Sequence, residues 1–230
     1  EIRRKSYGTL EACEKVSLVS TLDSISKGTE SVWPQSMERL GQNYGYILYR
    51  TTLHTEENLE KIRLWGANDR ADILLDDKLV ATLYDRELLK ERELNLPARR
   101  DARLDILMEN MGRVNFGPYM ERQRKGIDQC VQINGHMHNH WVQYPLPLDN
   151  VDKVDFDREY LPGTPAFYRF VFNVEEIGDT FLDFEGWGKG CAFVNGFNIG
   201  RFWEIGPQKR LYIPGPLLRE GENEIILFET

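Results

Sequence analysis

Short apolar runs alternate with turn-forming residues along most of this chain. The runs span about four to eight residues, are rich in β-branched and aromatic types, and are bounded by Gly, Asp, Asn and Pro. This pattern is typical of β-strands. Helical periodicity is weak, and the pattern predicts a helical turn only at residues 36–40, with an early strand at residues 15–21.

The same pattern of apolar runs occurs twice, at a constant spacing of 119 positions. The aligned segments are residues 47–53 with 166–172, 73–77 with 192–196, 79–83 with 198–202, and 106–108 with 225–227. Because four segments share one spacing without a gap, the two copies are expected to share an architecture.

A turn signal lies at the same place in each copy. Asp76-Asp77 separates two runs in the first copy, and Asn195-Gly196 separates the corresponding runs in the second. Asn-Gly is the strongest short signal for a β-hairpin. Short strands at regular spacing with turns between them indicate a sandwich or jelly roll. The predicted fold class is therefore all-β, with two tandem jelly-roll-like β-sandwich domains.

This periodicity also predicts the domain boundaries. Residues 1–32 are expected to be a lead-in or linker, and residues 33–135 the first β-sandwich. Residues 136–149 are expected to connect it to the second β-sandwich, residues 150–230, which ends in a strand at residues 224–229.

Composition narrows the classes of protein to consider. The chain has 230 residues, of which 41% are hydrophobic, and its formal net charge is −8. A basic footprint is therefore missing, so neither nucleic acid nor an anionic membrane is expected as the main partner. No apolar run approaches the length of about 18 residues that would span a bilayer. The chain starts Glu-Ile-Arg-Arg, without Met or an apolar signal segment, and we interpret it as an internal piece of a longer protein.

The cysteines are few and widely separated. Cys13, Cys130 and Cys191 form no Cys-x-x-Cys pair. An odd, sparse set favours free core thiols over a disulfide framework, and it favours a reducing compartment such as the cytoplasm.

Two candidate sites with possible chemistry can be read from the residues. His136, His138 and His140 would project to one face of an extended strand and could bind zinc. The alternative is a solvated, His-rich connector, which we favour because no carboxylate that could orient the imidazoles is evident nearby. Asp183 and Glu185 alternate with aromatic residues, as acids on the outer face of a strand do.

Known catalytic and cofactor motifs are missing from the sequence. Gly-x-Ser-x-Gly, His-Glu-x-x-His and a phosphate-binding Gly loop before a helix do not occur. No pair of carboxylates stands out with the spacing of a glycosidase site. We therefore expect no cofactor, no resident metal and no catalytic residue in this chain.

Aromatic residues are concentrated in the second copy. They are Phe181, Phe184, Trp187, Phe193, Phe197, Phe202, Trp203 and Tyr212. Most alternate as core positions do, and buried aromatics dominate sandwich cores. The alternative is a carbohydrate-binding surface, because exposed aromatic rings can stack on the C–H faces of sugars.

Four longer motifs are more specific than this periodicity. They are residues 34–50 (Pro-Gln-Ser-Met-Glu-Arg-Leu-Gly-Gln-Asn-Tyr-Gly-Tyr-Ile-Leu-Tyr-Arg), 110–117 (Asn-Met-Gly-Arg-Val-Asn-Phe-Gly), 141–148 (Trp-Val-Gln-Tyr-Pro-Leu-Pro-Leu) and 193–214, which begins Phe-Val-Asn-Gly-Phe-Asn-Ile-Gly-Arg. In this order they resemble the region that follows the catalytic barrel in bacterial-type β-galactosidases of glycoside hydrolase family 35.

The resemblance implies a part of an enzyme. Members of that family have an N-terminal (β/α)₈ barrel that carries two catalytic Glu residues, and such a barrel needs about 250 residues. The parent activity would be retaining hydrolysis of terminal β-D-galactosyl residues, with a β-galactoside glycan as substrate. This chain alone is expected to be inactive, because the catalytic Glu pair would lie outside it.

Further expectations come from the same resemblance. The second copy would be a galactose-binding-like domain. The chain would pack on the catalytic barrel of the same polypeptide and shape the substrate entrance. A homodimer is left open as another partner, and a carbohydrate-binding module acting through the second domain is the alternative function.

The resemblance also implies one substrate-binding residue. In the family, an aromatic of the first β domain reaches the sugar site, and its counterpart here is Phe116, which follows Val114-Asn115. The family often has Tyr at this position, so Phe116 keeps the stacking face and lacks the hydroxyl. The alternative is a loop aromatic that packs against the barrel or the sandwich.

Overall fold

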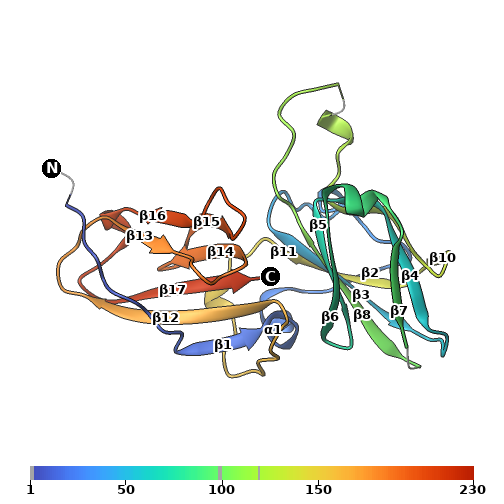
Figure 1. The fold of residues 1–230 in the computed structure, drawn as a ribbon, viewed down its shortest axis with the longest axis horizontal. Helices are drawn as coiled ribbons and strands as arrows, with labels where there is room; N and C mark the ends of the chain where they lie inside the picture. The colour runs from blue at the N-terminus through green and yellow to red at the C-terminus, as the bar shows by residue number, and fades with distance from the viewer. Residues whose placement is uncertain (1–2, 98–99, 119) are drawn as a thin grey trace. The chain divides into compact units, whose positions relative to one another are not determined.

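The structure is a computed structural model that describes residues 3–97, 100–118 and 120–230 (Figure 1). It divides into two compact units. Unit 1 comprises residues 1–24 and 150–230, and unit 2 comprises residues 25–149. The chain therefore begins and ends in the same unit.

Unit 2 is a sandwich of two antiparallel sheets. In the described part of the chain, the larger sheet has the strand order β2-β11-β3-β8-β5-β6 and the smaller one β10-β9-β4-β7 (Figure 1). The strands of the larger sheet are β2 (Thr29–Ser31), β3 (Tyr46–Leu53), β5 (Arg70–Leu75), β6 (Lys78–Tyr84), β8 (Ala102–Glu109) and β11 (Trp141–Leu146). Those of the smaller sheet are β4 (Leu59–Asn68), β7 (Arg92–Leu96), β9 (Gly126–Ile133) and β10 (His136–His138). The described residues of the unit also form the 3₁₀ helices η1 (Glu38–Leu40), η2 (Asp85–Leu89) and η3 (Met120–Arg122).

Alternate residues of the two sheets form the core of unit 2. Ile47 and Ile106 of the larger sheet are buried together with Ile62 and Val131 of the smaller sheet. Since side chains alternate between the faces of a strand, the alternating apolar positions of the sequence produce this layer directly. Tyr49 lies in the same core, and its hydroxyl donates to the carbonyl of Gln35 at 2.7 Å.

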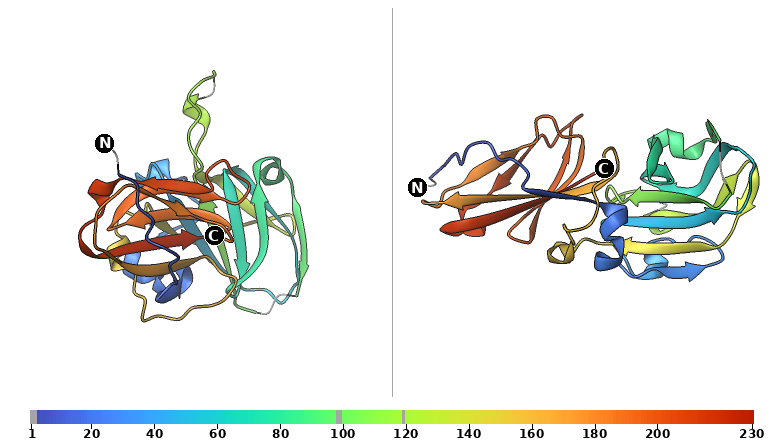
Figure 2. Two further views of the ribbon diagram at one scale, coloured as in Figure 1. Left: turned by 60° about the vertical axis from the view of Figure 1, so that its left-hand side comes forward. Right: turned by 90° about the horizontal axis from the view of Figure 1, so that it is seen from below.

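Unit 1 is a second, smaller sandwich (Figure 2). Its described sheets have the orders β1-β12-β17-β14-β15 and β13-β16. The strands are β1 (Glu14–Ser17), β12 (Ala166–Val174), β13 (Thr180–Asp183), β14 (Lys189–Val194), β15 (Phe197–Trp203), β16 (Arg210–Ile213) and β17 (Gly221–Glu229). The helices are α1 (Leu18–Ile25), which runs to the division between the units, η4 (Val151–Lys153) and η5 (Gly215–Leu217). Phe172, Phe202 and Leu227 of the larger sheet and Ile213 of the smaller sheet are buried between the layers.

Strand order confirms the predicted repeat. The order β3-β8-β5-β6 of unit 2 recurs as β12-β17-β14-β15 in unit 1. Both expected hairpins form, with Asp76-Asp77 between β5 and β6 and Asn195-Gly196 between β14 and β15. A register shift also falls at equivalent positions, after Ile73 in β5 and after Ala192 in β14.

The last strand of the repeat departs from the common spacing. Ile106 of β8 lies opposite Ile73, whereas Leu227 of β17 lies opposite Ala192. The last strands therefore correspond at a spacing of 121 and not 119, so the expected match of residues 106–108 with 225–227 is wrong by two positions. Two additional residues in the connection before β17 account for the difference.

The N-terminal residues differ from the expected lead-in. Glu14–Ser17 forms β1, which pairs antiparallel with β12 at the edge of the unit 1 sheet. The expected strand at residues 15–21 stops at Ser17, because α1 begins at Leu18. Leu18, Leu22 and Ile25 are buried at the spacing of one helix face, so a helical signal was present in the sequence.

Residues 136–149 also differ from the expected connector. They contribute β10 and β11 to the two sheets of unit 2. Trp141 explains the attachment of β11, because its side chain is only 1% exposed and it belongs to the core of that sandwich.

The structure also bears on the expected lack of a membrane span and on the expected burial of the cysteine thiols. No helix among the described residues is long and apolar enough to cross a membrane. Within the described residues Cys13, Cys130 and Cys191 form no disulfide; Cys191 is buried, Cys130 is half-buried and Cys13 is exposed. The prediction of core thiols is therefore right for Cys191 and wrong for Cys13.

Candidate functional site

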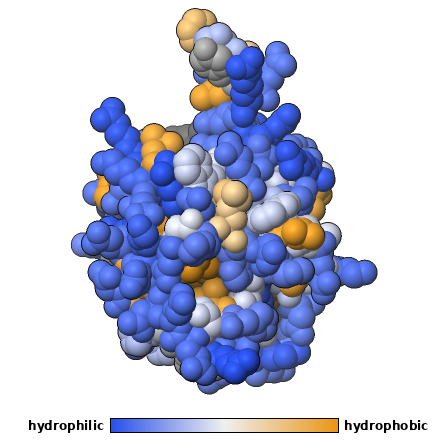
Figure 3. Space-filling view, turned by 90° about the vertical axis from the view of Figure 1, so that its right-hand side faces the viewer, coloured by the Kyte–Doolittle hydropathy of each residue, from blue (hydrophilic) through white to orange (hydrophobic). Residues whose placement is uncertain are grey.

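A long connection between β8 and β9, residues 110–125, projects from the sandwich of unit 2 (Figures 1 and 2). The connection carries η3 and exposes the apolar side chains of Val114, Phe116 and Met120. Figure 3 shows apolar surface on this projection, above a face of unit 2 that is mostly hydrophilic. Long irregular connections on rigid scaffolds are frequent sites of function. We call residues 110–125 the β8–β9 loop.

Phe116 is the predicted substrate-binding residue, and it lies in this loop. Its side chain is 91% exposed. The ring of Phe116 therefore does not pack against the sandwich of unit 2, which was one of the two packing surfaces considered above. The expectation that Phe116 faces a sugar stays a prediction.

The first anchor of the β8–β9 loop is Asp69, which lies between β4 and β5. Its Oδ2 accepts a hydrogen bond from the backbone N–H of Met111 at 2.7 Å. Lys125 Nζ donates to both carboxylate oxygens of Asp69 at 2.8 Å. The Lys125 side chain is 1% exposed and that of Asp69 is 20% exposed. Asp69 therefore joins the start of the loop to its end through charge-assisted bonds that are shielded from water.

The second anchor is Glu38 at the start of η1. Its Oε1 accepts from Arg113 Nη1 at 2.6 Å, and both of its carboxylate oxygens accept from the backbone N–H of Lys125 at 3.1 Å. Burial alone would raise the pKa of Glu38. The hydrogen bonds from Arg113 and from backbone N–H groups outweigh burial, so the pKa of this carboxyl is lower than usual.

The sequence around Glu38 fixes the position of this carboxylate. Met37 is fully buried, and its backbone N–H donates to the carbonyl of Lys125 at 2.9 Å. Gly41 ends η1 in a left-handed conformation, with a φ of 71°. A buried residue on one side and a glycine stop on the other hold η1 against the end of the loop.

Asparagines brace the start of the loop. Asn110 Nδ2 donates to the carbonyl of Asn43 at 3.0 Å, and Arg113 Nη2 donates to the same carbonyl at 3.0 Å. The Asn110 side chain also accepts from the backbone N–H of Gly112 at 3.0 Å. Asn110 and Arg113 of the Asn-Met-Gly-Arg motif thus tie the start of the loop to the carbonyl of Asn43.

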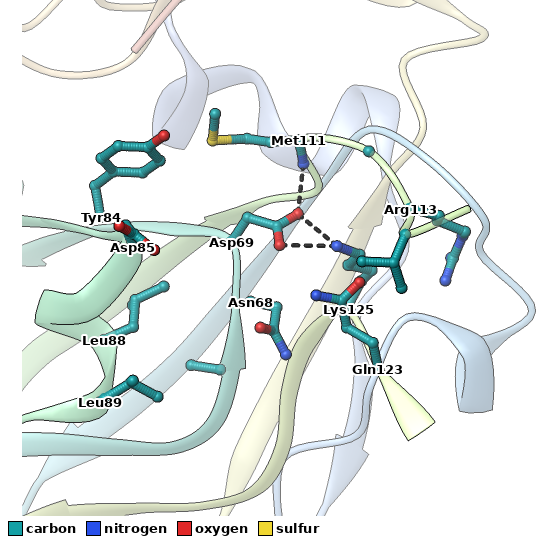
Figure 4. A pocket seen from close by; sticks show the side chains of 13 residues that line it. Asn68, Asp69, Tyr84, Asp85, Leu88, Leu89, Met111, Arg113, Gln123 and Lys125 are labelled. Atoms are coloured by element: carbon teal, nitrogen blue, oxygen red, sulfur yellow. Dashed lines mark hydrogen bonds and ion pairs between the residues drawn. The ribbon is translucent and has the colours of Figure 1, made fainter. Parts of the chain in front are cut away.

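A pocket of about 510 Å³ opens beside these anchors (Figure 4). Its apolar lining residues include Leu88, Leu89, Met111 and Val114. Its polar lining residues include Asn68, Asp69, Gln123 and Lys125, and Figure 4 shows Asp69 between the two leucines and Lys125. Asp69 accepts from Lys125 Nζ and from the backbone N–H of Met111. The arrangement is thus suited to holding the loop and to contact with another surface.

The three histidines of the zinc hypothesis do not share one face. His136 and His138 lie in β10, but His140 has a left-handed φ of 64° and so breaks the alternation. His138 Nε2 lies 2.8 Å from Thr51 Oγ1. Burial lowers the pKa of His138, and the neighbouring His54 and His140 lower it further. In residues 3–97, 100–118 and 120–230, no three His, Cys, Asp or Glu side chains are placed to hold a metal ion.

The acids of the second copy lie at the surface of unit 1. Asp183, at the end of β13, makes an ion pair with Arg210 Nη2 at 2.8 Å. Asp183 and Glu185 are exposed, whereas Phe184 between them is buried. This matches the expected outward acids and inward aromatic.

The aromatics of the second copy divide into core and surface groups. Phe184, Phe193 and Phe202 are buried, and Phe181, Phe197 and Tyr212 are exposed. Trp187 and Trp203 are half-buried and line a recess of about 1000 Å³ with Asp183, Glu185 and Arg210. The core prediction is confirmed for the first group, and the second group leaves the sugar-binding alternative open.

Sequence reasoning missed the two anchors of the β8–β9 loop. Glu38 and Asp69 lie far from the loop in sequence, and their link to it is visible only in the fold. A signal was available all the same, because both Glu38 and Arg113 lie inside the family-like motifs at residues 34–50 and 110–117.

Comparison with known families gives two matches in the same order as the two copies. Residues 34–147 match the family described as "Beta-galactosidase, first all-beta domain". Residues 165–223 match the family described as "Beta-galactosidase, galactose-binding domain".

Curated relatives agree with these matches. The chain is 36% identical to beta-galactosidase 1 of Dictyostelium discoideum over 98% of this chain and 37% of that relative. It is 33% identical to beta-galactosidase 17 of Arabidopsis thaliana over 99% of this chain and 37% of that relative. The chain thus spans well under half the length of these relatives. Among solved structures, a GH2 beta-galacturonidase from Eisenbergiella tayi aligns with 90% of this chain and 37% of its own chain. The TM-score is 0.32 and the identity 13%, so the likeness supports no argument.

Proposed function

We propose that this chain, which belongs to the β-galactosidase family, packs on the catalytic barrel of the same polypeptide and shapes the entrance for a β-galactoside. Within that family it is the β-domain region, which holds the first all-β domain and the galactose-binding domain. The parent enzyme would hydrolyse terminal β-D-galactosyl residues. The chain's own part in this reaction is to present a surface beside the substrate.

The observation that carries the proposal is the exposure of the β8–β9 loop. Val114, Phe116 and Met120 are apolar, yet the sandwich of unit 2 leaves each of them at least 47% exposed. Large apolar side chains displayed together on a projecting segment mark a contact with another surface or a ligand. A sugar offers an apolar C–H face, so the ring of Phe116 is suited to stack on it.

Replacement of Phe116 in the full-length enzyme tests the proposal. Aromatic stacking on a ligand is worth about 1–3 kcal/mol, with base stacking as the nearest calibrated case, so Phe116→Ala should lower kcat/KM by roughly 5–150-fold. Phe116→Tyr should retain activity, because it keeps the stacking face. The melting temperature of the present chain should stay unchanged in both variants, since Phe116 is 91% exposed.

A matched control is Met137→Ala, which removes another exposed apolar side chain of unit 2, 64% exposed, outside the loop. Met137→Ala should leave kcat/KM unchanged. Unaltered kinetics in Phe116→Ala would show that the β8–β9 loop does not contribute to the substrate entrance.

A second function, glycan binding by unit 1, is favoured by the recess that Trp187 and Trp203 line. It combines two indole rings with the Asp183–Arg210 pair, which offers both hydrogen-bond donors and acceptors. Aromatic rings with a few fixed polar groups are typical of small-molecule sites.

Titration of this chain with galactose, followed by tryptophan fluorescence or calorimetry, tests the second function. Arg210→Gln should weaken saturable binding, whereas Arg158→Gln, a change at another exposed ion pair of unit 1, should not. Absence of saturable binding at millimolar galactose would remove this candidate.

A further inference from the structure

The two ends of the β8–β9 loop are tied together twice, each time through a single carboxylate. Glu38 accepts from Arg113 at the start of the loop, at 2.6 Å, and from the backbone of Lys125 at its end, at 3.1 Å. Asp69 accepts from the backbone of Met111 at the start, at 2.7 Å, and from Lys125 Nζ at the end, at 2.8 Å. Each carboxylate therefore bridges both ends.

The two carboxylates come from parts of unit 2 that are independent of the loop. Glu38 belongs to η1, and Asp69 follows β4, whose strand is paired with β7 and β9. Met37, next to Glu38, is fully buried and bonds to the carbonyl of Lys125 at 2.9 Å. The sandwich therefore holds the two carboxylates in place, and the carboxylates hold the two ends of the β8–β9 loop.

Between these ends the loop has little packing of its own. Val114 is 47% exposed, Phe116 is 91% exposed and Met120 is 48% exposed. A segment with few buried contacts opens at low free energy unless its ends are fixed. The position of Phe116 therefore depends on the geometry at the two ends of the loop.

We propose that Glu38 and Asp69 are positioning residues, which hold the two ends of the β8–β9 loop together and so fix where Phe116 is presented. This inference rests on the proposed role of Phe116 at the substrate entrance. Neither carboxylate needs to touch the substrate, and both act through the loop.

Glu38 is the better residue for the experiment. Loss of the Asp69 charge would leave Lys125, whose side chain is 1% exposed, as a buried cation without its partner, and the chain could fail to fold. The side chain of Arg113, by contrast, is 40% exposed, so water can solvate it when Glu38 loses its charge. Glu38→Gln keeps the shape and removes the charge. The matched control is Lys61→Gln, which breaks the exposed Lys61–Glu91 pair of unit 2, 3.0 Å long and away from the loop.

The first measurement uses the present chain and does not depend on any enzymatic role. Amide hydrogen exchange in residues 110–118 and 120–125 should be faster in Glu38→Gln by about tenfold, as expected when the opening free energy of a local unit falls. Tryptic cleavage at Arg122 and Arg124 should accelerate in parallel. The strands of unit 2 should keep their protection, and Lys61→Gln should change neither readout.

The second measurement is a double-mutant cycle in the full-length enzyme. Glu38→Gln should lower kcat/KM by about tenfold, since a small misplacement of a positioning group can have an effect of that order or more. In the Phe116→Ala background, Glu38→Gln should have no further effect, because the group it positions is gone. Lys61→Gln should have no effect in either background.

The outcomes separate the inference from the function on which it rests. If Phe116→Ala lowers kcat/KM but Glu38→Gln changes neither exchange in the loop nor kinetics, the positioning role is wrong. If the two substitutions are additive, Glu38 acts by a route other than Phe116 and the inference is also wrong. If Phe116→Ala itself has no kinetic effect while Glu38→Gln still loosens the loop, the proposed function is what fails.

Discussion

At the scale of single residues, Asp76 and Asn195 make the same contacts in the two copies. Both start a hairpin turn with a left-handed φ, 46° and 48°. Asp76 donates its backbone N–H to Arg103 and accepts from the N–H of Arg103 through its side chain, each at 2.9 Å. Asn195 does the same with Glu224, again at 2.9 Å. Both turns need a side chain that tolerates this conformation and reaches the strand beside it in the sheet, β8 or β17. Asp and Asn meet both conditions.

Asn195 makes additional hydrogen bonds, so its replacement should lower the free energy of unfolding more than replacement of Asp76. Its Nδ2 donates to the carbonyl of Leu217 at 2.8 Å and to Asn223 Oδ1 at 2.9 Å. Asn195→Ala should lower the free energy of unfolding of unit 1 by about 2–4 kcal/mol, from unpaired polar groups and a left-handed Ala. Asn195→Gly should cost about 1 kcal/mol less, because glycine accepts the positive φ. Urea unfolding of the three proteins measures both values, and equal losses for Ala and Gly would refute the argument from backbone strain.

At the scale of elements, the β8–β9 loop behaves as a segment whose order depends on its ends. The pKa of Glu38 is lower in the folded protein than in the unfolded chain. Its ionised form therefore stabilises the closed ends of the loop above the unfolded pKa, and this contribution disappears as the pH falls through the folded pKa. The loop should thus open under acid conditions in which the strands still hold.

Protection of the loop amides should consequently fall as the pH is lowered past the ordinary pKa of Glu and through the lower pKa of folded Glu38. The measurement is amide exchange at several pH values, corrected for the intrinsic exchange rate. Glu38→Gln should be loose at every pH and should lack the acid step. An acid step of the same size in Glu38→Gln would assign it to another carboxylate.

The same loop shows where prediction from sequence stops. The hairpins at Asp76 and Asn195 could be predicted because turn chemistry is local, and the repeat showed it twice. The contacts of Glu38 and Asp69 with residues 110–125 are long-range, and no local pattern encodes them. The helix α1 lies between these cases, since Leu18, Leu22 and Ile25 had the spacing of one helix face but followed directly on a strand pattern.

At the scale of the molecule, the two sandwiches share the same order of four strands and differ in the strands that each adds to them. Unit 2 extends the common four strands with β11 and β2, and its β9 and β10 enlarge the opposite sheet. Unit 1 adds only β1 to its larger sheet, and its opposite sheet consists of β13 and β16 in the described residues. The repeat predicted the shared strands. Of the added strands, β1 and β2 lie in the residues expected to be a lead-in, and β10 and β11 lie in those expected to be a connector, because neither segment recurs at the common spacing.

The resemblance to β-galactosidases implies that the catalytic Glu pair lies on the barrel, outside the two units. Glu38, Asp69 and Asp183 are each engaged with a basic side chain. Purified chain should therefore not hydrolyse a chromogenic β-galactoside, in an assay where the full-length enzyme serves as the positive control. Turnover by the chain, abolished by replacing one of its own Asp or Glu residues, would contradict this expectation.

The pairing of β1 with β12 has a consequence for how the protein is made on the ribosome. Unit 2 is encoded between Ser17 and its partner Ala166. At about 5–20 residues per second, the intervening chain takes roughly 7–30 s to synthesise. During that interval β1 has no strand to pair with, while all of unit 2 emerges and can fold. Unit 2 should therefore become ordered before β1 finds its partner strand, and a chaperone that shields an unpaired strand edge would be needed most in that interval.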